Sequence, residues 1–370
     1  MTTDSITRQK APHPVVRERE QDGLLILSPA TPVRRRVLFI NVSGGSATWR
    51  KYTSGLIPSN RLWGCVELLR NGYEVGVASA LPDFYLHRNP LPHDLKLRHA
   101  IRSWLQPDDI IYCAHNTLYW LPFLRKLGFL KQRVVSLLYA REPLKFATGH
   151  DGIIALNPAA EDHARRLAPG AKVTRLSWGM DMDFFPQLPY QPETFLACGR
   201  TNRDFPTLNG AARKTAARIR LIAHGVPASL VWPDNVEIVQ GGPGWEDRLT
   251  YRDLLDNYYA HSSGSLVVVR HDPTEETACG FTNLLEAMVM SRPVILTRTS
   301  ALKTELDIDA AGCGLFVPAE DSDSLAAAIT HLNNEPEQAR QMGERGRRLV
   351  ESYYNMERFG SEMHAFFESL

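Results

Sequence analysis

The stretch from Arg270 to Thr297 carries the residue types best suited to binding a phosphate group. A strand is expected to end near Arg270, and a loop containing Gly280 leads to a helix that we expect to start with Asn283 as its N-cap. Glu286 then falls three residues later, in the position of a capping box. The free N–H groups and the positive end of such a helix favour an anion in front of the loop. A capping box without any ligand explains the same residues.

Two arginines follow a predicted strand over 194–198, and a single long helix is predicted after them, over 207–224. The planar guanidinium group of arginine presents a fork of donors that matches phosphate oxygens. We therefore predict that Arg200 and Arg203 stabilise a phosphate-containing group, with an ordinary pair of surface arginines as the alternative.

The first half of the chain offers further candidates at the ends of its predicted strands. Gly44 and Gly45 follow the first of these strands and open a long polar loop over 46–60, and such loops often carry binding residues. His115 ends another strand, where it could orient a hydroxyl group or transfer a proton, or simply be a hydrogen-bonded structural histidine. The loop and the residues after it supply these candidates for contacts with a second substrate: Lys51, Asn60, Arg61 and Trp63.

Strands alternate with amphipathic segments from residue 36 onward, which predicts parallel sheets covered by helices on both faces. A proline-rich segment near 186–192 interrupts the alternation, which then starts again. The fold class is therefore α/β, with two doubly wound, Rossmann-like domains facing each other across a cleft. The predicted boundaries are a flexible tail over 1–30, an N-terminal domain over 31–186, a linker over 187–195, a C-terminal domain over 196–350 and a closing helix over 351–370 that packs back toward the N-terminal domain.

The 370 residues have a net charge of +1, which gives no overall drive toward nucleic acid. Residues 1–190 contain 25 Lys and Arg against 16 Asp and Glu, so the first half is basic and the second acidic. A basic half favours an anionic substrate or surface, and we expect peripheral contact with an anionic membrane as one option. The five scattered cysteines predict a reducing compartment, and we found no pattern typical of a signal peptide or a membrane span. We therefore expect a cytoplasmic protein, which could also be peripheral at the inner face of the membrane.

The stretch Leu285-Glu286-Ala287-Met288, followed by Arg292-Pro293-Val294-Ile295, resembles the donor-site signature of retaining glycosyltransferases of family 4, which have the two-domain GT-B fold. Cys198-Gly199-Arg200 resembles the Gly-Arg pair of that family. The segments 178–186 and 312–318 resemble its interdomain segment and its next conserved turn. The resemblance is clear over about 175–365 and weaker over 36–170.

The resemblance implies that the C-terminal domain binds a nucleoside diphosphate sugar and the N-terminal domain the acceptor. Glu286 would then bind the ribose, Arg200 and Arg203 the departing diphosphate. The implied donor-binding residues are Gly280, Phe281, Thr282, Asn283, Leu284 and Glu286. The implied acceptor or cleft residues are Gly44, Gly45, Arg61, Tyr139 and Glu142, the last two standing where the family often has a histidine. The family's first motif glutamate falls at Ala278, so the motif does not predict which sugar is transferred.

These features predict a retaining glycosyltransferase of the hexosyltransferase type, active in polysaccharide biosynthesis on an unidentified acceptor. No cofactor and no metal are expected, because the arginines would supply the positive charge. The alternatives are a non-catalytic nucleotide-sugar-binding protein on the same fold and a GT-B epimerase. A phosphorylase would need a pyridoxal lysine, for which the second domain offers only Lys214 and Lys303, and a dinucleotide-binding dehydrogenase would need a G-x-G-x-x-G loop, which the sequence lacks.

Overall fold

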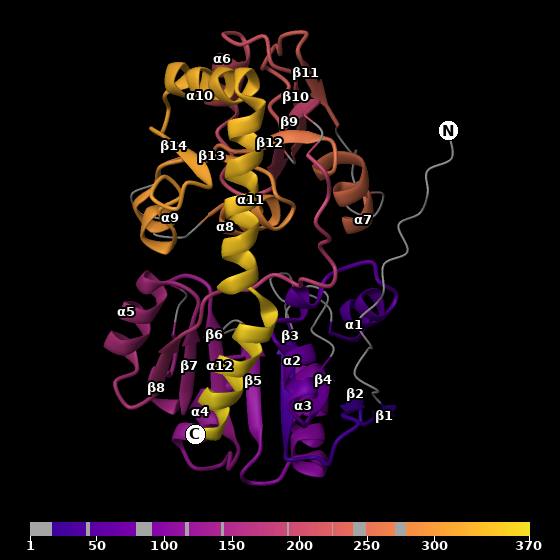
Figure 1. Ribbon diagram of the computed structural model, residues 1–370. Helices are drawn as coiled ribbons and strands as arrows, with labels where there is room; N and C mark the ends of the chain where they lie inside the picture. The colour runs from indigo at the N-terminus through magenta and orange to yellow at the C-terminus, as the bar shows by residue number, and fades with distance from the viewer. Residues whose placement is uncertain are drawn as a thin grey trace.

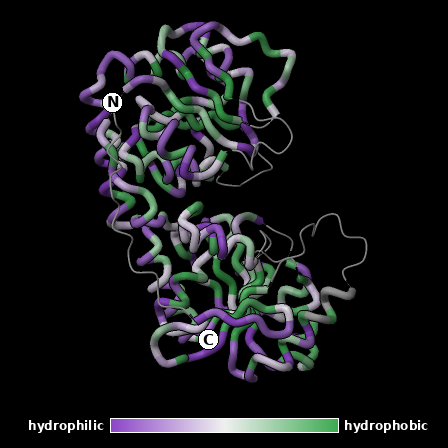
Figure 2. Tube along the Cα trace, turned by 90° about the vertical axis from the view of Figure 1, so that its right-hand side faces the viewer, coloured by the Kyte–Doolittle hydropathy of each residue, from purple (hydrophilic) through white to green (hydrophobic). Residues whose placement is uncertain are grey.

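The computed structural model contains two α/β halves, one above the other, joined by the chain crossing between them twice (Figure 1). It describes residues 17–41, 45–78, 91–114, 118–141, 144–190, 192–223, 225–239, 249–270 and 279–370. Hydrophobic residues concentrate along the strands of both halves, while hydrophilic residues predominate on the helices around them (Figure 2). No helix within these ranges is long and apolar enough to cross a lipid bilayer.

The N-terminal half is built on an eight-stranded sheet with the order β1-β2-β4-β3-β5-β6-β7-β8. From β4 to β8 all neighbouring strands are parallel, and runs such as the IIYCA of β5 are buried along their whole length because helices cover both faces. The strands are β1 Arg17–Gln21, β2 Leu24–Ser28, β3 Arg35–Asn41, β4 Tyr73–Ala78, β5 Ile110–Ala114, β6 Arg133–Leu138, β7 Gly152–Ala155 and β8 Lys172–Arg175.

The predicted flexible tail over 1–30 is wrong for residues 17–28, which form the hairpin of β1 and β2. Asp22 and Gly23 both have positive φ, 52° and 80°, as a tight two-residue hairpin turn requires. The hairpin adds antiparallel to β4 and so covers one edge of the sheet. It is held there because the apolar residues of β2 are buried, and because Glu74 of β4 binds Ser28 and Arg19.

The C-terminal half is built on a six-stranded parallel sheet with the order β11-β10-β9-β12-β13-β14. The single long helix predicted over 207–224 is wrong: helix α6 ends at Ala212, and β10 follows beside β9. All residues of β10 except Arg220 are buried in the sheet, and this burial outweighs the helical tendency of the arginine- and alanine-rich sequence before it. The strands are β9 Thr194–Gly199, β10 Ile219–Ala223, β11 Val236–Ile238, β12 Ser262–Val267, β13 Val294–Thr297 and β14 Gly314–Val317.

The helices lie around the two sheets in the positions that parallel connections require. Their bounds in the N-terminal half are α1 Gly45–Thr53, α2 Cys65–Arg70, α3 Leu91–Trp104, α4 Trp120–Lys126 and α5 Pro158–Leu167, with short 3-10 turns at Ser59–Leu62 and Ala147–Gly149. Those of the C-terminal half are α6 Phe205–Ala212, α7 Tyr251–Asp253 with the π-turn Leu254–Tyr259, α8 Phe281–Val289, α9 Ser300–Glu305, α10 Ser322–Asn334 and α11 Pro336–Ser352. The last helix, α12 Met356–Glu368, lies against the N-terminal half (Figure 1).

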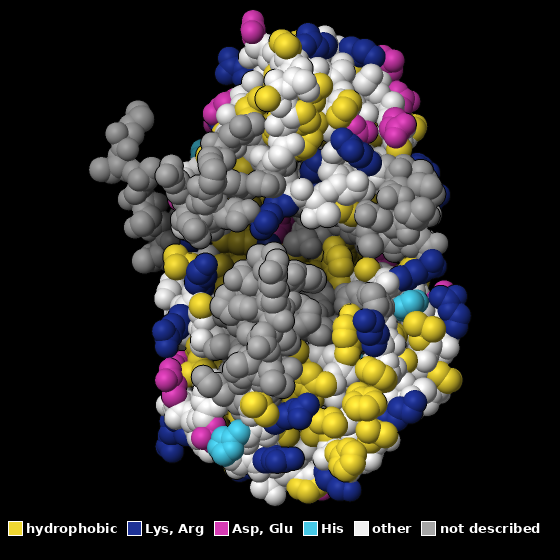
Figure 3. Space-filling model, turned by 180° about the vertical axis from the view of Figure 1, so that it is seen from behind, with side chains coloured by type: hydrophobic (Ala, Val, Ile, Leu, Met, Phe, Trp, Pro, Cys, Tyr) yellow, Lys and Arg dark blue, Asp and Glu magenta, His cyan; other side chains and the backbone are white. Residues whose placement is uncertain are grey.

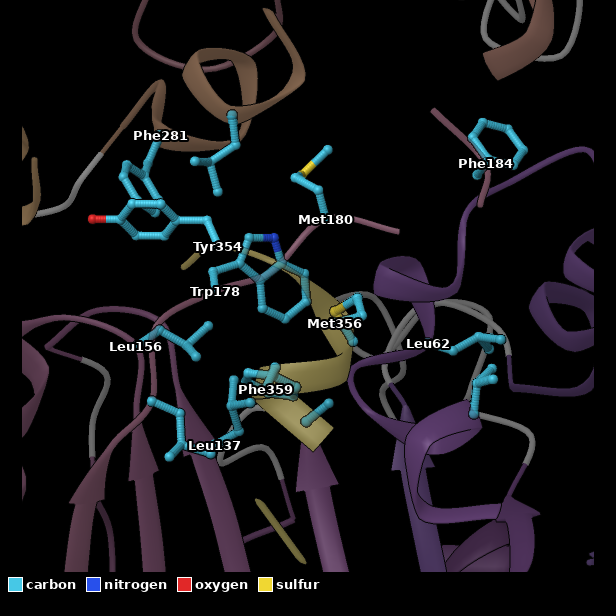
Figure 4. Packing of buried hydrophobic residues seen from close by; sticks show 14 of the residues in the cluster. Leu62, Leu137, Leu156, Trp178, Met180, Phe184, Phe281, Tyr354, Met356 and Phe359 are labelled. Atoms are coloured by element: carbon cyan, nitrogen blue, oxygen red, sulfur yellow. The ribbon is translucent and has the colours of Figure 1, made fainter. Parts of the chain in front are cut away.

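The two crossings of the chain pair with each other. The backbone N–H of Met180 donates to Tyr354 at 2.7 Å, and that of Met356 donates to Met180 at 3.0 Å. Trp178 packs on Phe359 with ring centroids 5.5 Å apart, in the hydrophobic cluster of Figure 4. The two segments therefore form one short connection that fixes how the two halves meet. The predicted domain boundaries within and beside these segments stay predictions.

A buried carboxyl group lies where α2 meets α12. Glu67 is only 2% exposed and packs on Gly360, where any Cβ atom would clash with its side chain. Arg70 approaches it, with Nη1 3.7 Å from Oε1. Burial raises the pKa of Glu67 to about 7, an effect that Arg70 opposes only in part.

The raised pKa of Glu67 makes the stability of the protein depend on pH. The folded state holds the proton more tightly than the unfolded state, so the stabilisation is complete below pH about 4.5 and is lost as the pH rises through about 7. We predict that Glu67→Gln raises the free energy of unfolding at pH 8 by on the order of 3 kcal/mol and changes it little at pH 5. Urea unfolding at both pH values measures this, with the exposed Glu357→Gln on α12 as the control. A variant destabilised at both pH values would show instead that Glu67 is ionised and stabilised by Arg70.

Candidate functional site

A cavity of about 590 Å³ lies between the two halves, at the carboxyl ends of β9 and β6, a size in the range of small-molecule sites. Seen from behind, the molecule is hollowed between its halves, with basic side chains at the hollow (Figure 3). Eight of the residues predicted from the sequence line the cavity: Arg61, Tyr139, Arg200, Arg203, Gly280, Thr282, Asn283 and Glu286. Nine further lining residues were not predicted: Cys198, Gly199, Thr201, Ile222, Leu249, Thr250, Tyr251, Leu254 and Cys279.

Helix α8 begins beside the cavity, three residues earlier than predicted, because its N-cap is Gly280 and not Asn283. Its N-cap is Gly280, with a φ of 97°, and no side chain caps the helix, so the predicted capping box of Asn283 and Glu286 is wrong. The left-handed conformation of Gly280 fits a residue without a Cβ, since that atom would strike Val267. The N–H groups of the first turn have no partner inside the helix, and Thr282 and Asn283 of this turn line the cavity. The helix start can therefore bind an anion there.

The guanidinium group of Arg203 is fixed beside this helix start. It donates to the carbonyl of Cys198 from Nε at 3.3 Å and from Nη2 at 3.2 Å, and to that of Thr201 from Nη1 at 2.9 Å. Nη2 also donates to the side-chain oxygen of Asn283. Arg200 lines the same cavity. Two arginines and a helix N-terminus thus line the same cavity, a set of groups suited to a diphosphate.

The carboxylate of Glu286 lies deeper, among hydroxyl and amide donors. The side chain is buried, and its Oε2 atom accepts from Asn283 Nδ2 at 3.2 Å and from Tyr259 at 3.4 Å. The hydroxyl of Tyr251 donates to its Oε1 atom. Burial raises the pKa of Glu286, while Arg61, whose Nη2 lies 3.7 Å from Oε1, and these hydrogen bonds oppose the shift. The Glu286 carboxylate is therefore a hydrogen-bond acceptor, and its donors are side chains of the protein itself.

Tyr251 links this carboxylate to the opposite half of the molecule. Its hydroxyl accepts a hydrogen bond from Arg61 Nη2 at 2.8 Å, and the Arg61 guanidinium lies 4.9 Å from the centre of its ring. Arg61 belongs to the N-terminal half, in the turn Ser59–Leu62, whereas Tyr251 and Glu286 belong to the C-terminal half. The chain Arg61–Tyr251–Glu286 therefore closes part of the cleft.

Sequence reasoning did not identify Tyr251, although a local signal was present. Thr250 and Asp253 form a reciprocal capping box around it, with the hydroxyl of Thr250 accepting from the Asp253 N–H at 3.1 Å. The segment after Thr250 is a three-residue α-turn, Tyr251–Asp253, that continues as the π-turn Leu254–Tyr259. A π-turn is frequent at functional sites, and here it brings Tyr251 and Tyr259 to the same carboxylate.

The remaining predicted residues are placed differently. Phe281 and Leu284 are buried and do not line the cavity, although Phe281 stands at the start of α8. Gly45 begins α1 and also does not line it. His115, Gly44, Glu142 and Ala278 lie outside the residues that the structure describes. Across the described ranges, no group of three His, Cys, Asp or Glu side chains could hold a metal ion.

No protein-family model matches this sequence, and no curated protein matches it. Solved structures do resemble it. They include sucrose-phosphate synthase from Thermosynechococcus elongatus, 16% identical with a TM-score of 0.65, covering 91% of this chain and 99% of that one. HepE of Anabaena in complex with UDP and glucose is 12% identical with a TM-score of 0.61, covering 91% and 100%. A glycosyltransferase from Rickettsia africae is 14% identical with a TM-score of 0.63, covering 91% and 98%. Identities this low show the fold alone, which is the GT-B fold with two Rossmann-like domains across a cleft.

The close contact between Gly199 and Arg203 gives a prediction for the site. Gly199 has a φ of 139°, and a Cβ atom there would collide with the guanidinium group of Arg203. We predict that Gly199→Ala lowers the free energy of unfolding by about 1–3 kcal/mol, the usual cost of a strained backbone conformation. Urea unfolding measures the change, and Gly170→Ala, where a Cβ would meet open space, is the control. Equal stability of Gly199→Ala and wild type would mean that Arg203 is not held against this glycine.

Proposed function

We propose that this protein is a retaining glycosyltransferase that transfers a sugar from a nucleoside diphosphate sugar to a hydroxyl-bearing acceptor. The observation that carries the proposal is that one cavity is lined by arginines, by a helix N-terminus and by a buried carboxylate. Arg200, Arg203 and the start of α8 suit the diphosphate, and Glu286 suits hydroxyl groups such as those of a ribose. The similar HepE structures contain UDP and glucose or UDP-glucose, which supports a nucleotide-sugar donor.

The proposed reaction breaks the bond between the sugar and the diphosphate of the donor, and it needs positive charge next to that diphosphate. Negative charge grows on the diphosphate as it leaves, and Arg203 is already oriented by three backbone and side-chain partners, so it needs no reorganisation to stabilise that charge. The sequence resemblance to family 4 favours a front-face path with retention, in which the leaving phosphate accepts the acceptor's proton. We expect no requirement for a divalent metal, because the two arginines supply the charge.

The acceptor side rests on the N-terminal half of the cleft. Arg61 and Tyr139 line the cavity from that half, and burial raises the pKa of Tyr139, which keeps its hydroxyl protonated. His115 stays a prediction for a catalytic residue, and Gly44, Gly45 and Glu142 stay predictions for acceptor binding. On the family resemblance we propose polysaccharide biosynthesis in the cytoplasm, with peripheral contact between the basic N-terminal half and an anionic membrane.

Tyr251 and Glu286 make the donor proposal testable with UDP as the ligand. A ribose that binds Glu286 has to replace the Tyr251 hydroxyl, so Tyr251→Phe should bind UDP about tenfold more tightly, the worth of one hydrogen bond of about 1–1.5 kcal/mol. Glu286→Gln should bind UDP at least about tenfold more weakly, because bonds to a charged acceptor are lost. Calorimetry on the full chain measures both constants.

Tyr190→Phe provides the matched control, since this tyrosine donates to the Ser263 carbonyl at 2.8 Å and does not line the cavity. The wild type should also bind UDP more tightly than its 2′,3′-dideoxy analogue, and Glu286→Gln should lose that preference. Unchanged UDP affinity in both Tyr251→Phe and Glu286→Gln would remove Glu286 from the donor site.

The proposed role of Arg203 is tested by turnover rather than binding. Without an acceptor, a glycosyltransferase slowly hydrolyses its donor, so free sugar released from UDP-glucose and related donors measures activity. We predict that Arg203→Ala lowers the rate constant by about 10²-fold or more, with a smaller effect on donor binding. Arg340→Ala, which removes an exposed arginine paired with Glu337, is the control. EDTA should leave the rate unchanged.

The same assay separates the alternatives. Tight binding of nucleotide-sugars without release of sugar would indicate a binding protein, and interconversion of the donor sugars would indicate an epimerase. Wild-type turnover in Arg203→Ala would show that this arginine has a structural role only, and loss of activity in EDTA that magnesium restores would overturn the metal-independent path.

A further inference from the structure

Exposed hydrophobic side chains gather around the end of helix α4, far from the cleft. Phe129 is 78% exposed and Leu127 50%, and Phe146 and Phe123 are 45% and 39% exposed. We call these four residues the Phe129 patch. Hydrophobic side chains with Lys and Arg among them gather on the lower half of the molecule seen from behind, the half that contains α4 (Figure 3). Large apolar side chains grouped in this way usually mark an interaction surface.

The patch is held by local structure. The rings of Phe123 and Phe146 pack with centroids 4.8 Å apart. The turn Ala147–Gly149 is pressed against α4, since a Cβ atom at Gly149 would collide with the backbone of Pro122. Gly128 takes a φ of 76° and turns the chain at the end of α4, which leaves Phe129 exposed. The hydrophobic residues therefore project from a fixed base.

The described charged residues of the segment that carries the patch are basic. Among the described residues of 118–150 there are no Asp or Glu side chains, and the basic ones are Arg125, Lys126, Lys131, Arg133, Arg141 and Lys145. Arg125 is neutralised by Asp151, which it contacts at 2.7 and 2.9 Å. Lys126, Lys131 and Lys145 are exposed. An apolar centre surrounded by lysines complements a partner that has a negatively charged outer layer and an apolar interior beneath it.

We propose that the Phe129 patch docks the protein on an anionic lipid bilayer. The aromatic and leucine side chains enter the boundary between headgroups and acyl chains, and the lysines lie at the level of the lipid phosphates. This membrane-docking role rests on the proposed function, which includes peripheral contact with a membrane. It assigns that contact to one surface, the Phe129 patch. A lipid bilayer suits the patch better than an acidic groove of another protein does. The reason is that the most exposed residues of the Phe129 patch protrude from the end of a helix instead of lining a cavity.

The test uses the full chain and sedimentation with vesicles of phosphatidylcholine alone or with about 30% phosphatidylglycerol. We expect binding to the anionic vesicles, weakening with salt, and little binding to the neutral ones. Phe129→Ser and the double variant Lys126→Glu/Lys131→Glu should each lower the partition constant on the order of tenfold or more. Val231→Ser and Lys303→Glu are the matched controls, since each changes an exposed residue of the same kind in the C-terminal half, and they should bind like wild type.

UDP affinity is measured on the same samples. Loss of vesicle binding with unchanged UDP affinity supports the docking surface and shows that the variants are folded. Patch-dependent vesicle binding in a protein that binds no UDP would leave the docking surface standing and reject the proposed function. Vesicle binding that is absent in the wild type, or equal in the patch variants and the controls, overturns the proposal, as does self-association that Phe129→Ser abolishes, which would assign the patch to a second copy of the chain.

Discussion

A single buried carboxylate organises the cleft. Taking the charge of Glu286 out of water is costly unless donors replace the lost hydration, and the donors come from separate parts of the chain. Asn283 belongs to the same helix, Tyr259 and Tyr251 to the turn before β12, and Arg61 to the opposite half. Asn283 also accepts from Arg203, so the group that satisfies the carboxylate fixes the cation as well. Glu286 and Arg203 are therefore parts of one hydrogen-bonded network.

This network depends on how the two halves are joined. The carboxylate of Asp181, in the first crossing segment, accepts from the backbone N–H of Ser59 at 2.7 Å and from that of Phe184 at 3.2 Å. Ser59 begins the turn that carries Arg61, so the same aspartate sets the crossing segment and the residue that reaches across the cleft. Pairing of Met180 with Tyr354 and Met356 then fixes the second crossing against the first. The two crossing segments therefore determine the position of Arg61 over Tyr251. In this sense the connection between the halves is part of the site.

The sequence allowed the fold class and eight of the residues that line the cavity to be predicted, because continuous apolar runs and the positions after strand ends are local signals. It failed where tertiary contacts decide. Residues 219–223 form a strand because they are buried beside β9, and Arg17–Gln21 forms one because the Asp22-Gly23 turn returns the chain to the sheet. Local sequence predicts Asn283 as the N-cap, but Gly280 already starts the helix, and the Asn283 amide bonds to Arg203 and Glu286 instead. Tyr251 could not be placed at the cavity from its neighbours alone, since its role arises from two residues far away in sequence, Arg61 and Glu286.

The hydrogen bonds that Glu286 accepts from the protein constrain how a ligand can reach it. A carboxylate has room for about four hydrogen bonds, and three donors with an arginine already surround this one. Two of these donors, Tyr259 and Asn283, are also held by contacts with Cys198 in the C-terminal half. A ligand can therefore replace Tyr251 and Arg61 with the least rearrangement of the protein. Any hydroxyl-bearing ligand that takes their place breaks the contact between Arg61 and Tyr251, which is a contact between the two halves. Binding of a ligand to Glu286 and the relative position of the two halves are therefore linked. By thermodynamic reciprocity, any change that separates Arg61 from Tyr251 also favours binding of the ligand.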